Sequence, residues 1–184
     1  MKLPGVRRLV RLREADSTQS VARRLADAGA PDGTLVWALR QTSGRGRQGR
    51  RWRSPPGGLY VSWILRPSFA PERLAELSLA CGWSLAAALR DFGVKTAVKP
   101  PNDVLALCAD GQARKIGGIL CEARGDSSKI EWLIIGVGVN VNNGATLKRA
   151  TSLLELTGRR TSLARALRAA MGRLSLARRV GNFL

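Results

Sequence analysis

The sequence contains no histidine. Without an imidazole, the chain cannot form a Ser-His or Cys-His nucleophile pair, a two-histidine zinc helix or a histidine general base. Acids are also scarce, because 13 Asp and Glu residues oppose 31 Lys and Arg residues. Any reaction at this chain must therefore use lysine, arginine, the few carboxylates, backbone N–H groups or a bound metal ion.

Cysteines and long apolar runs are few as well. The three cysteines, Cys81, Cys108 and Cys121, lie far apart and lack the spacing of metal ligands. They are typical of buried or free thiols in a reducing compartment, which predicts a cytoplasmic protein. No apolar run reaches membrane-spanning length and no signal-peptide pattern opens the chain, so we expect no membrane partner.

The rest of the composition is that of one globular domain. The 184 residues are 45% hydrophobic, which is enough chain for a single core. A net charge of +18 would ordinarily favour nucleic acid as a partner. Arginine is spread along the whole chain, however, so charge alone does not separate nucleic-acid binding from a bias in composition.

The most distinctive stretch runs from Gln41 to Tyr60 and is here called the arginine loop. Its glycines let the backbone approach a ligand closely, and guanidinium groups bind phosphate and carboxylate through a rigid fork of donors. We interpret the loop as a clamp for a phosphorylated small molecule. Six arginines fall within fourteen residues that contain no acid, namely Arg40, Arg45, Arg47, Arg50, Arg51 and Arg53.

The loop also matches a dinucleotide-binding fingerprint, Gly44-x-Gly46-x-x-Gly49. That motif must end a strand and open a helix. Here two prolines and two glycines follow at residues 55–58, and they cannot continue a helix. No Gly-Lys-Ser/Thr sequence follows either, so neither a Rossmann site nor a P-loop is expected.

Periodicity and turn residues predict more strands than helices. Strands are expected at residues 6–14, 34–40, 59–65, 96–99, 104–107, 115–122 and 130–142. Helices are expected from a cap at residues 16–18 to residue 28, and at residues 71–90 and 161–180. Because hairpins join most strands, we predict an α+β domain with a mixed, mostly antiparallel sheet backed by helices. The core is expected to contain Trp37, Trp63, Trp83 and Trp132.

Two of the predicted strands carry glycines in their interiors. Gly117 and Gly118 lie in one strand, and Gly136 and Gly138 lie in the longest one. Glycine weakens a strand and often marks a close approach of a ligand or another backbone. These pairs predict a pocket in which a ligand lies flat on the backbone, although Gly117-Gly118 could instead mark a β-bulge.

Four stretches, taken together and in this order, resemble the catalytic domain of biotin protein ligases. They cover roughly residues 8–142 and comprise residues 16–19 (D-S-T-Q), 41–54, 102–103 (N-D) with 115–120 (K-I-G-G-I-L), and 136–140 (G-V-G-V-N). The fold of this family is similar to that of class II aminoacyl-tRNA synthetases, which agrees with the α+β prediction.

The resemblance implies a two-step reaction. Members of the family use ATP and Mg²⁺ to convert biotin to biotinyl-5'-AMP, and then pass the biotinyl group to a lysine of a biotin carboxyl carrier protein, as in acetyl-CoA carboxylase. It implies a single catalytic domain over residues 1–184, and we expect neither an N-terminal helix-turn-helix nor the family's C-terminal β-barrel in this chain.

The resemblance also assigns roles to individual residues. Biotin-binding roles go to Ser17, Thr18, Gln19, Gln41, Gly44, Arg45, Arg47, Lys115, Gly118, Gly136 and Gly138. Nucleotide-binding roles go to Arg45, Arg47, Arg50, Trp52, Asn102, Lys115 and Asn140. Catalytic roles go to Lys115, Arg47 and Asp103, with Asp103 as the hypothesised group that accepts or orients a proton of the acceptor lysine. No metal ligand set is assigned.

Simpler readings stay open beside these roles. Ser17 and Thr18 could have no role other than capping a helix, and Asp103 could simply form an Asx-turn. The family usually has Asn where this chain has Gln19, and Trp where it has Pro100. Alternative functions are a lipoate-type ligase or transferase, or a non-catalytic biotin- or nucleic-acid-binding relative, with nucleic acid the least favoured partner. An exposed sheet edge could also pair two copies into a homodimer.

Overall fold

The computed structural model describes residues 2–69, 71–144 and 149–180. Within these ranges it has the strands β1 (Arg8–Leu12), β2 (Thr34–Ala38), β3 (Leu59–Leu65), β4 (Thr96–Lys99), β5 (Asp103–Leu107), β6 (Ala113–Gly125) and β7 (Ile130–Val139). The helices are α1 (Thr18–Asp27), α2 (Leu74–Arg90), α3 (Leu153–Thr157) and α4 (Leu163–Val180), with 3-10 turns at Arg47–Gly49 and Pro71–Arg73.

The strands form one sheet in the order β1-β2-β3-β7-β6-β5-β4. β1 and β2 run parallel, and each of the other neighbouring pairs runs antiparallel. The predicted α+β class and the mixed, mostly antiparallel sheet are therefore confirmed.

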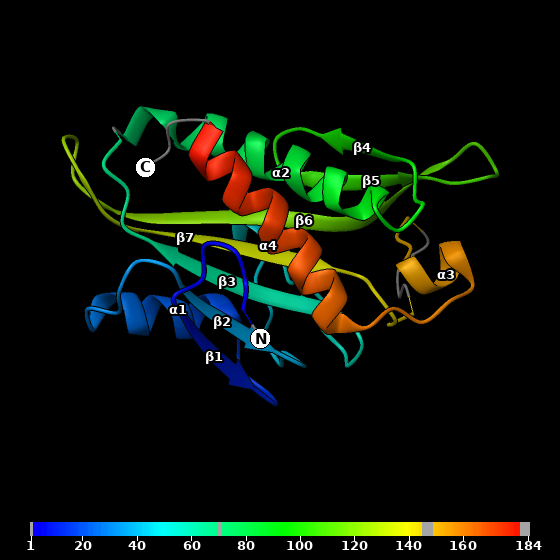
Figure 1. Ribbon diagram of the computed structural model, residues 1–184, viewed down its shortest axis with the longest axis horizontal. Coiled ribbons are helices and arrows are strands. Elements are labelled where there is room, and N and C mark those ends of the chain that lie inside the picture. The colour runs from blue at the N-terminus through cyan, green and yellow to red at the C-terminus, as the bar shows by residue number, and fades with distance from the viewer. Residues whose placement is uncertain (1, 70, 145–148, 181–184) are drawn as a thin grey trace.

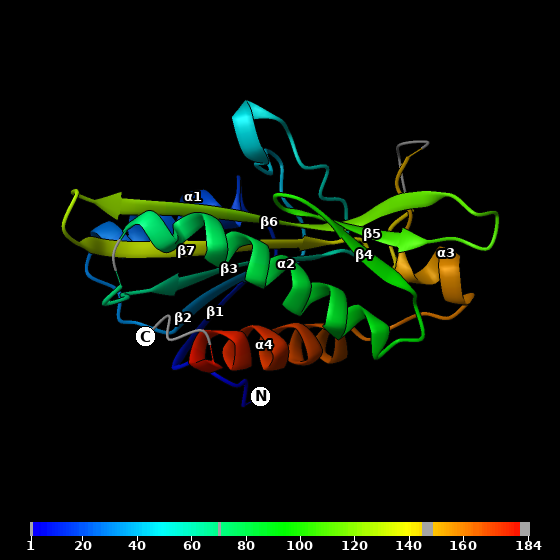
Figure 2. The same ribbon diagram turned by 90° about the horizontal axis from the view of Figure 1, so that it is seen from above.

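Helices cover both faces of this sheet (Figures 1 and 2). α2 and α4 lie on one face, whereas α1 and the arginine loop lie on the other, as the view from above shows. The larger apolar core lies on the α2 and α4 side and includes Trp63, Leu85 and Leu167. A smaller cluster on the α1 side includes Ala22 and Ile134. All seven residues of β3 are buried. This strand lies inside the sheet, and helices cover both of its faces.

The α1 face of the sheet has an apolar half and a glycine half. Side chains of a strand alternate between faces, so Trp132, Ile134, Gly136 and Gly138 of β7 share one face. The first two belong to the apolar cluster beneath α1. The two glycines follow where that cluster ends, and they leave space above the sheet for the site described below.

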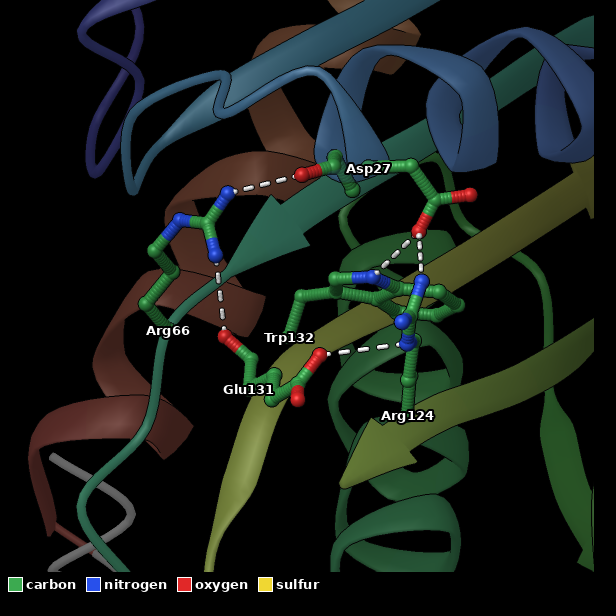
Figure 3. Close-up of polar contacts among 6 residues, drawn as sticks. Asp27, Arg66, Arg124, Glu131 and Trp132 are labelled. Carbon is green, nitrogen blue, oxygen red and sulfur yellow. Dashed lines mark hydrogen bonds and ion pairs between the residues drawn. The ribbon is translucent and has the colours of Figure 1, made fainter.

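A polar network fixes the C-terminal end of α1 to this face (Figure 3). Asp27 Oδ1 accepts a hydrogen bond from Trp132 Nε1 at 2.9 Å and pairs with Arg124 at 3.1 Å. Arg124 also pairs with Glu131, whose backbone carbonyl accepts a bond from Arg66 at 3.0 Å. Arg66 further donates to the carbonyl of Ala26 in the last turn of α1, where a positive group is favourable, and to that of Ala30 just after the helix. This anchoring holds the opposite, N-terminal end of α1 over the glycines.

The predicted element boundaries were good for β3 and β4, which begin and end where expected. α3 was missed, although its Ser152–Glu155 capping box is a recognisable start signal. The prediction that Trp83 lies in the core was wrong: its side chain is on the outer face of α2 and is 50% exposed. In the part of the chain that the structure describes, no helix combines the length and apolarity needed to cross a membrane.

Candidate active site

A cavity of about 550 Å³ lies on the glycine half of the α1 face. This volume suits a small-molecule ligand. The N-terminal end of α1, the arginine loop, the β4–β5 turn and strands β6 and β7 contribute to its wall. The predicted site residues that line it are Ser17, Thr18, Gln19, Gln41, Arg45, Arg47, Arg50, Trp52, Asn102, Asp103, Lys115, Gly118, Gly136, Gly138 and Asn140.

Gly44 is the one predicted site residue that is not part of this wall. It is buried at the base of the arginine loop, where its carbonyl accepts a bond from the Trp52 N–H at 2.8 Å. A Cβ at position 44 would lie 2.6 Å from Ser54 Oγ, so only glycine lets the two sides of the loop approach this closely.

One end of the cavity is polar and is organised by hydrogen bonds around Gln41. Its Oε1 accepts bonds from the N–H and the Oγ1 of Thr18, at 2.7 and 3.0 Å, and its Nε2 donates to Ser54 Oγ at 2.7 Å. Ser17 caps α1 by accepting a bond from the Gln19 N–H at 3.2 Å. The capping reading of Ser17 is therefore confirmed, and the same residue also lines the cavity.

Gln19 supplies a buried donor that lacks a protein partner. Its side chain is 3% exposed, and its Oε1 lies 2.9 Å from Ser62 Oγ. Its Nε2 has no hydrogen-bond partner among the described residues. A buried unpaired donor is costly, and an acceptor on a bound ligand would satisfy it.

The glycines form a floor that side chains already touch. A Cβ on Gly136 would lie 2.6 Å from Gln19 Oε1, and one on Gly138 would lie 2.7 Å from the Trp52 ring. The Trp52 ring also approaches Gly118. The Trp52 indole thus lies on the part of the floor predicted to carry the ligand, and a side chain at position 138 would collide with the ring where it now lies.

The opposite end of the cavity is cationic. Lys115 Nζ lies 2.6 Å from Asp103 Oδ1 and 5.1 Å from the centre of the Trp52 ring. Arg47 donates to Asn102 Oδ1 at 3.4 Å. The Asn102 amide is held in turn by the Ile119 carbonyl, to which its Nδ2 donates at 2.9 Å. The lysine, the arginine and the single carboxylate predicted to act catalytically are thus brought together.

Arg45 is fixed at the side of the cavity by a carboxylate that the sequence analysis left unassigned. Its NH2 group lies 3.0 Å from Glu122 Oε1. The other oxygen of Glu122 lies 3.1 Å from the NH2 group of Arg23 on α1. These three residues, called the Arg23–Glu122–Arg45 triad below, join α1, β6 and the arginine loop.

Asn140 has a structural role that the resemblance did not indicate. Its Nδ2 donates to the Thr151 carbonyl at 3.0 Å, and its Oδ1 accepts a bond from Asn143 Nδ2 at 3.0 Å. The Thr151 N–H donates to the Lys115 carbonyl at 2.9 Å. Asn140 therefore holds the backbone segment that runs beside Lys115.

Two ionisable groups near the site have shifted pKa values. The backbone N–H of Ser17 holds the pKa of Asp16 below its ordinary value. Burial raises the pKa of Tyr60, whose hydroxyl donates to the Pro55 carbonyl at 2.8 Å within the C-terminal part of the arginine loop. Both groups therefore keep their ordinary charge states near neutral pH.

Sequence reasoning missed Ser62, Glu122, Arg23 and Asn143 as parts of the site. Ser62 had a usable signal, because it is a polar residue inside a strand of apolar neighbours. Glu122 and Arg23 have partners far away in the chain, which no local pattern reveals. Asn143 bonds to Asn140 and Val141 close by, within the turn that follows β7. Pro100, which departs from the family pattern, also lies in the cavity wall.

The comparisons with known proteins agree on one family. The model of the biotin/lipoate A/B protein ligase family matches residues 12–140. The chain is 39% identical over 128 residues to the bifunctional ligase/repressor BirA of Bacillus subtilis, a match that covers 68% of this chain and 38% of that protein. It is 35% identical over 133 residues to the biotin–[acetyl-CoA-carboxylase] ligase of Paracoccus denitrificans, covering 71% and 53%.

A solved structure shows the same fold. It is the biotin protein ligase from Aquifex aeolicus in complex with biotin and ATP, with a TM-score of 0.78 and 37% identity over 93% of this chain and 70% of that one. This chain therefore aligns with about two-fifths to about half of the two curated relatives' length.

Proposed function

This chain belongs to the biotin/lipoate A/B protein ligase family, and from that premise we propose that it joins biotin to AMP and passes the biotinyl group to a lysine of a carrier protein. The observation that carries the proposal is one cavity with two ends. A neutral, hydrogen-bonding end around Gln41 suits an uncharged ring, and a cationic end around Lys115 suits a carboxylate and phosphates.

The first step needs no histidine. The carboxylate of biotin is already ionised at neutral pH, so it can attack the α-phosphate of ATP directly, forming a C–O–P linkage while pyrophosphate leaves. The difficulty is to bring two anions together. Lys115 of β6 and Arg45 and Arg47 of the arginine loop line the cavity, and their charges oppose this repulsion and stabilise the charge that develops at phosphorus.

A magnesium ion fits this site when it arrives with the nucleotide. Among the described residues, no cluster of three His, Cys, Asp or Glu could hold a metal alone. Mg²⁺ is commonly held by one carboxylate together with substrate phosphates, and Asp103 is the carboxylate that the described cavity wall offers. When bound, Mg²⁺ would neutralise charge on the departing pyrophosphate.

In the second step, an amine of the carrier protein attacks the carbonyl carbon of biotinyl-5'-AMP. An amide bond forms, the bond to AMP breaks, and the attacking amine loses a proton. We assign Asp103 to accept or orient that proton, because it lines the cavity beside Lys115. An Asp103→Asn variant that transfers biotin at the wild-type rate would contradict this assignment.

The test of the proposal is exchange of labelled pyrophosphate into ATP. We expect exchange with biotin and much less with lipoate, because the neutral end of the cavity offers paired amide and hydroxyl groups that suit a ureido ring. Exchange with lipoate alone would move the chain to the lipoate branch. Absence of exchange with either acid, in a folded sample that binds biotin, would contradict ligase activity.

A further inference from the structure

Glu122 forms an ion pair with the arginine loop but has no role in the mechanism above. Glu122 follows Gly118 and Leu120 on the same face of β6, so it stands where the glycine floor ends. Five arginines lie within the loop at positions 45, 47, 50, 51 and 53. Among the described residues, Glu122 is the only acid that forms an ion pair with any of them.

We propose that Glu122 is a positioning residue that holds the arginine loop closed by binding Arg45. This inference rests on the proposed function and names a further residue of the same site. The loop concentrates positive charge and repels itself, so an ordered position needs a fixed negative charge. Glu122 supplies one, since its side chain is only 18% exposed and its carboxylate lies 3.0 Å from the Arg45 guanidinium.

The same carboxylate ties the loop to α1. Its second oxygen pairs with Arg23 at 3.1 Å, while the N-terminal residues of α1, Thr18 and Gln19, form the neutral end of the cavity. The Arg23–Glu122–Arg45 triad therefore fixes the distance between the neutral end and the loop. A network of partly buried charges is held more firmly than a single exposed pair.

Binding Glu122 does not prevent Arg45 from binding a ligand. A guanidinium has five N–H donors, and the ion pair engages one nitrogen of Arg45. The Arg45 side chain remains 40% exposed at the cavity. Glu122 thus preorganises the arginine, which lowers the ordering cost that substrate binding would otherwise bear.

The first experiment measures the loop without using catalysis. Trypsin cleaves after arginine, so the rate of cleavage within residues 45–53 of the ligand-free protein reports how often the loop opens. We expect Glu122→Gln to raise this rate several-fold. The matched control is Asp91→Asn, which removes an exposed Asp–Arg pair at the end of α2, on the other face of the sheet, and should leave the rate unchanged. Cleavage of Glu122→Gln at the wild-type rate would overturn the proposal.

The second experiment measures substrate use. In biotin-dependent pyrophosphate exchange, we expect Glu122→Gln to raise the KM for biotin and ATP roughly tenfold with kcat changed much less, because the loop must then be ordered by the substrates. Glu122→Asp keeps the charge and should restore part of the loss. A fall in kcat alone, or equal defects in both variants, would contradict positioning.

These two readouts separate the two proposals. If the wild-type protein shows no exchange, the ligase proposal fails, whereas the trypsin comparison still tests Glu122. If Glu122→Gln does not fold, Arg23→Gln takes its place. That variant keeps the Glu122–Arg45 pair but frees it from α1, and it should raise loop cleavage by a smaller factor. No increase with Arg23→Gln would then overturn the role of the triad.

Discussion

Replacing Lys115 by glutamine tests the cationic end of the cavity most directly. The Lys115 ammonium lies 2.6 Å from Asp103 Oδ1 and 5.1 Å from the centre of the Trp52 ring. Lys115→Gln keeps a polar side chain of similar reach but removes the charge. It also leaves the Asp103 carboxylate without its partner in a cavity proposed to hold the carboxylate of biotin and the phosphates of ATP.

The expected loss has two parts. A fixed donor aimed at the charge developing on phosphorus contributes about 2–4 kcal/mol, by analogy with oxyanion-hole donors. The unpaired Asp103 carboxylate adds a repulsion of about 1 kcal/mol, because its side chain is 30% exposed and water screens it. Together these terms predict that kcat/KM falls about 10²- to 10⁴-fold, at about 1.4 kcal/mol for each factor of ten.

The assay is biotin-dependent pyrophosphate exchange, which reports the first step only. Lys129→Gln is the matched control, because this exposed lysine lies in the turn between β6 and β7. Retention of more than about a tenth of wild-type kcat/KM by Lys115→Gln would refute the cationic role.

Three further outcomes follow from other parts of the structure. Asn143→Ala should lower the free energy of unfolding in urea by about 2–3 kcal/mol, because it leaves the buried Val141 N–H unpaired. Gly136→Ala should weaken biotin binding in calorimetry by roughly tenfold, because its Cβ would lie 2.6 Å from Gln19 Oε1 and displace that amide. Burial raises the pKa of the Cys81 thiol well above its ordinary value near 9. As the pH rises, this thiol therefore ionises in the unfolded state at a lower pH than in the folded state. Stability should therefore fall above about pH 9, and less steeply in Cys81→Ala.

Local patterns predicted the parts of this fold whose causes are local. β3 was predicted with its correct bounds because Pro67 and the glycines at 57–58 limit a strongly apolar run. It was also predictable that the Gly44-x-Gly46-x-x-Gly49 motif does not open a long helix, since its last three residues form a 3-10 turn and no helix follows at residues 50–58. Proline and glycine act on their immediate neighbours, so their effect can be read without the fold.

The contacts between distant segments were not predictable in the same way. The ion pair of Glu122 with Arg45 forms only because the loop folds back over β6. The hydrogen bond from the Asn140 amide to the Thr151 carbonyl forms only because the chain returns beside β7 at residue 151. Trp83 shows the converse error. Its helix has an apolar outer stripe as well as a buried one, and only the packing of α2 on the sheet decides which stripe is covered.

The position of the cavity follows from the position of its glycines in the sheet. Glycine inside a strand costs about 0.5–1 kcal/mol relative to alanine, so glycine-rich strands need support from their neighbours. Gly138 of β7 pairs with Tyr60 on one side and Gly118 on the other, and Gly118 also pairs with Asp103 of β5. Each glycine of this floor is thus held by backbone ladders on both sides. A bare backbone surface can stay rigid only in such a place, which explains why the ligand site lies at the centre of the sheet and not at its edge.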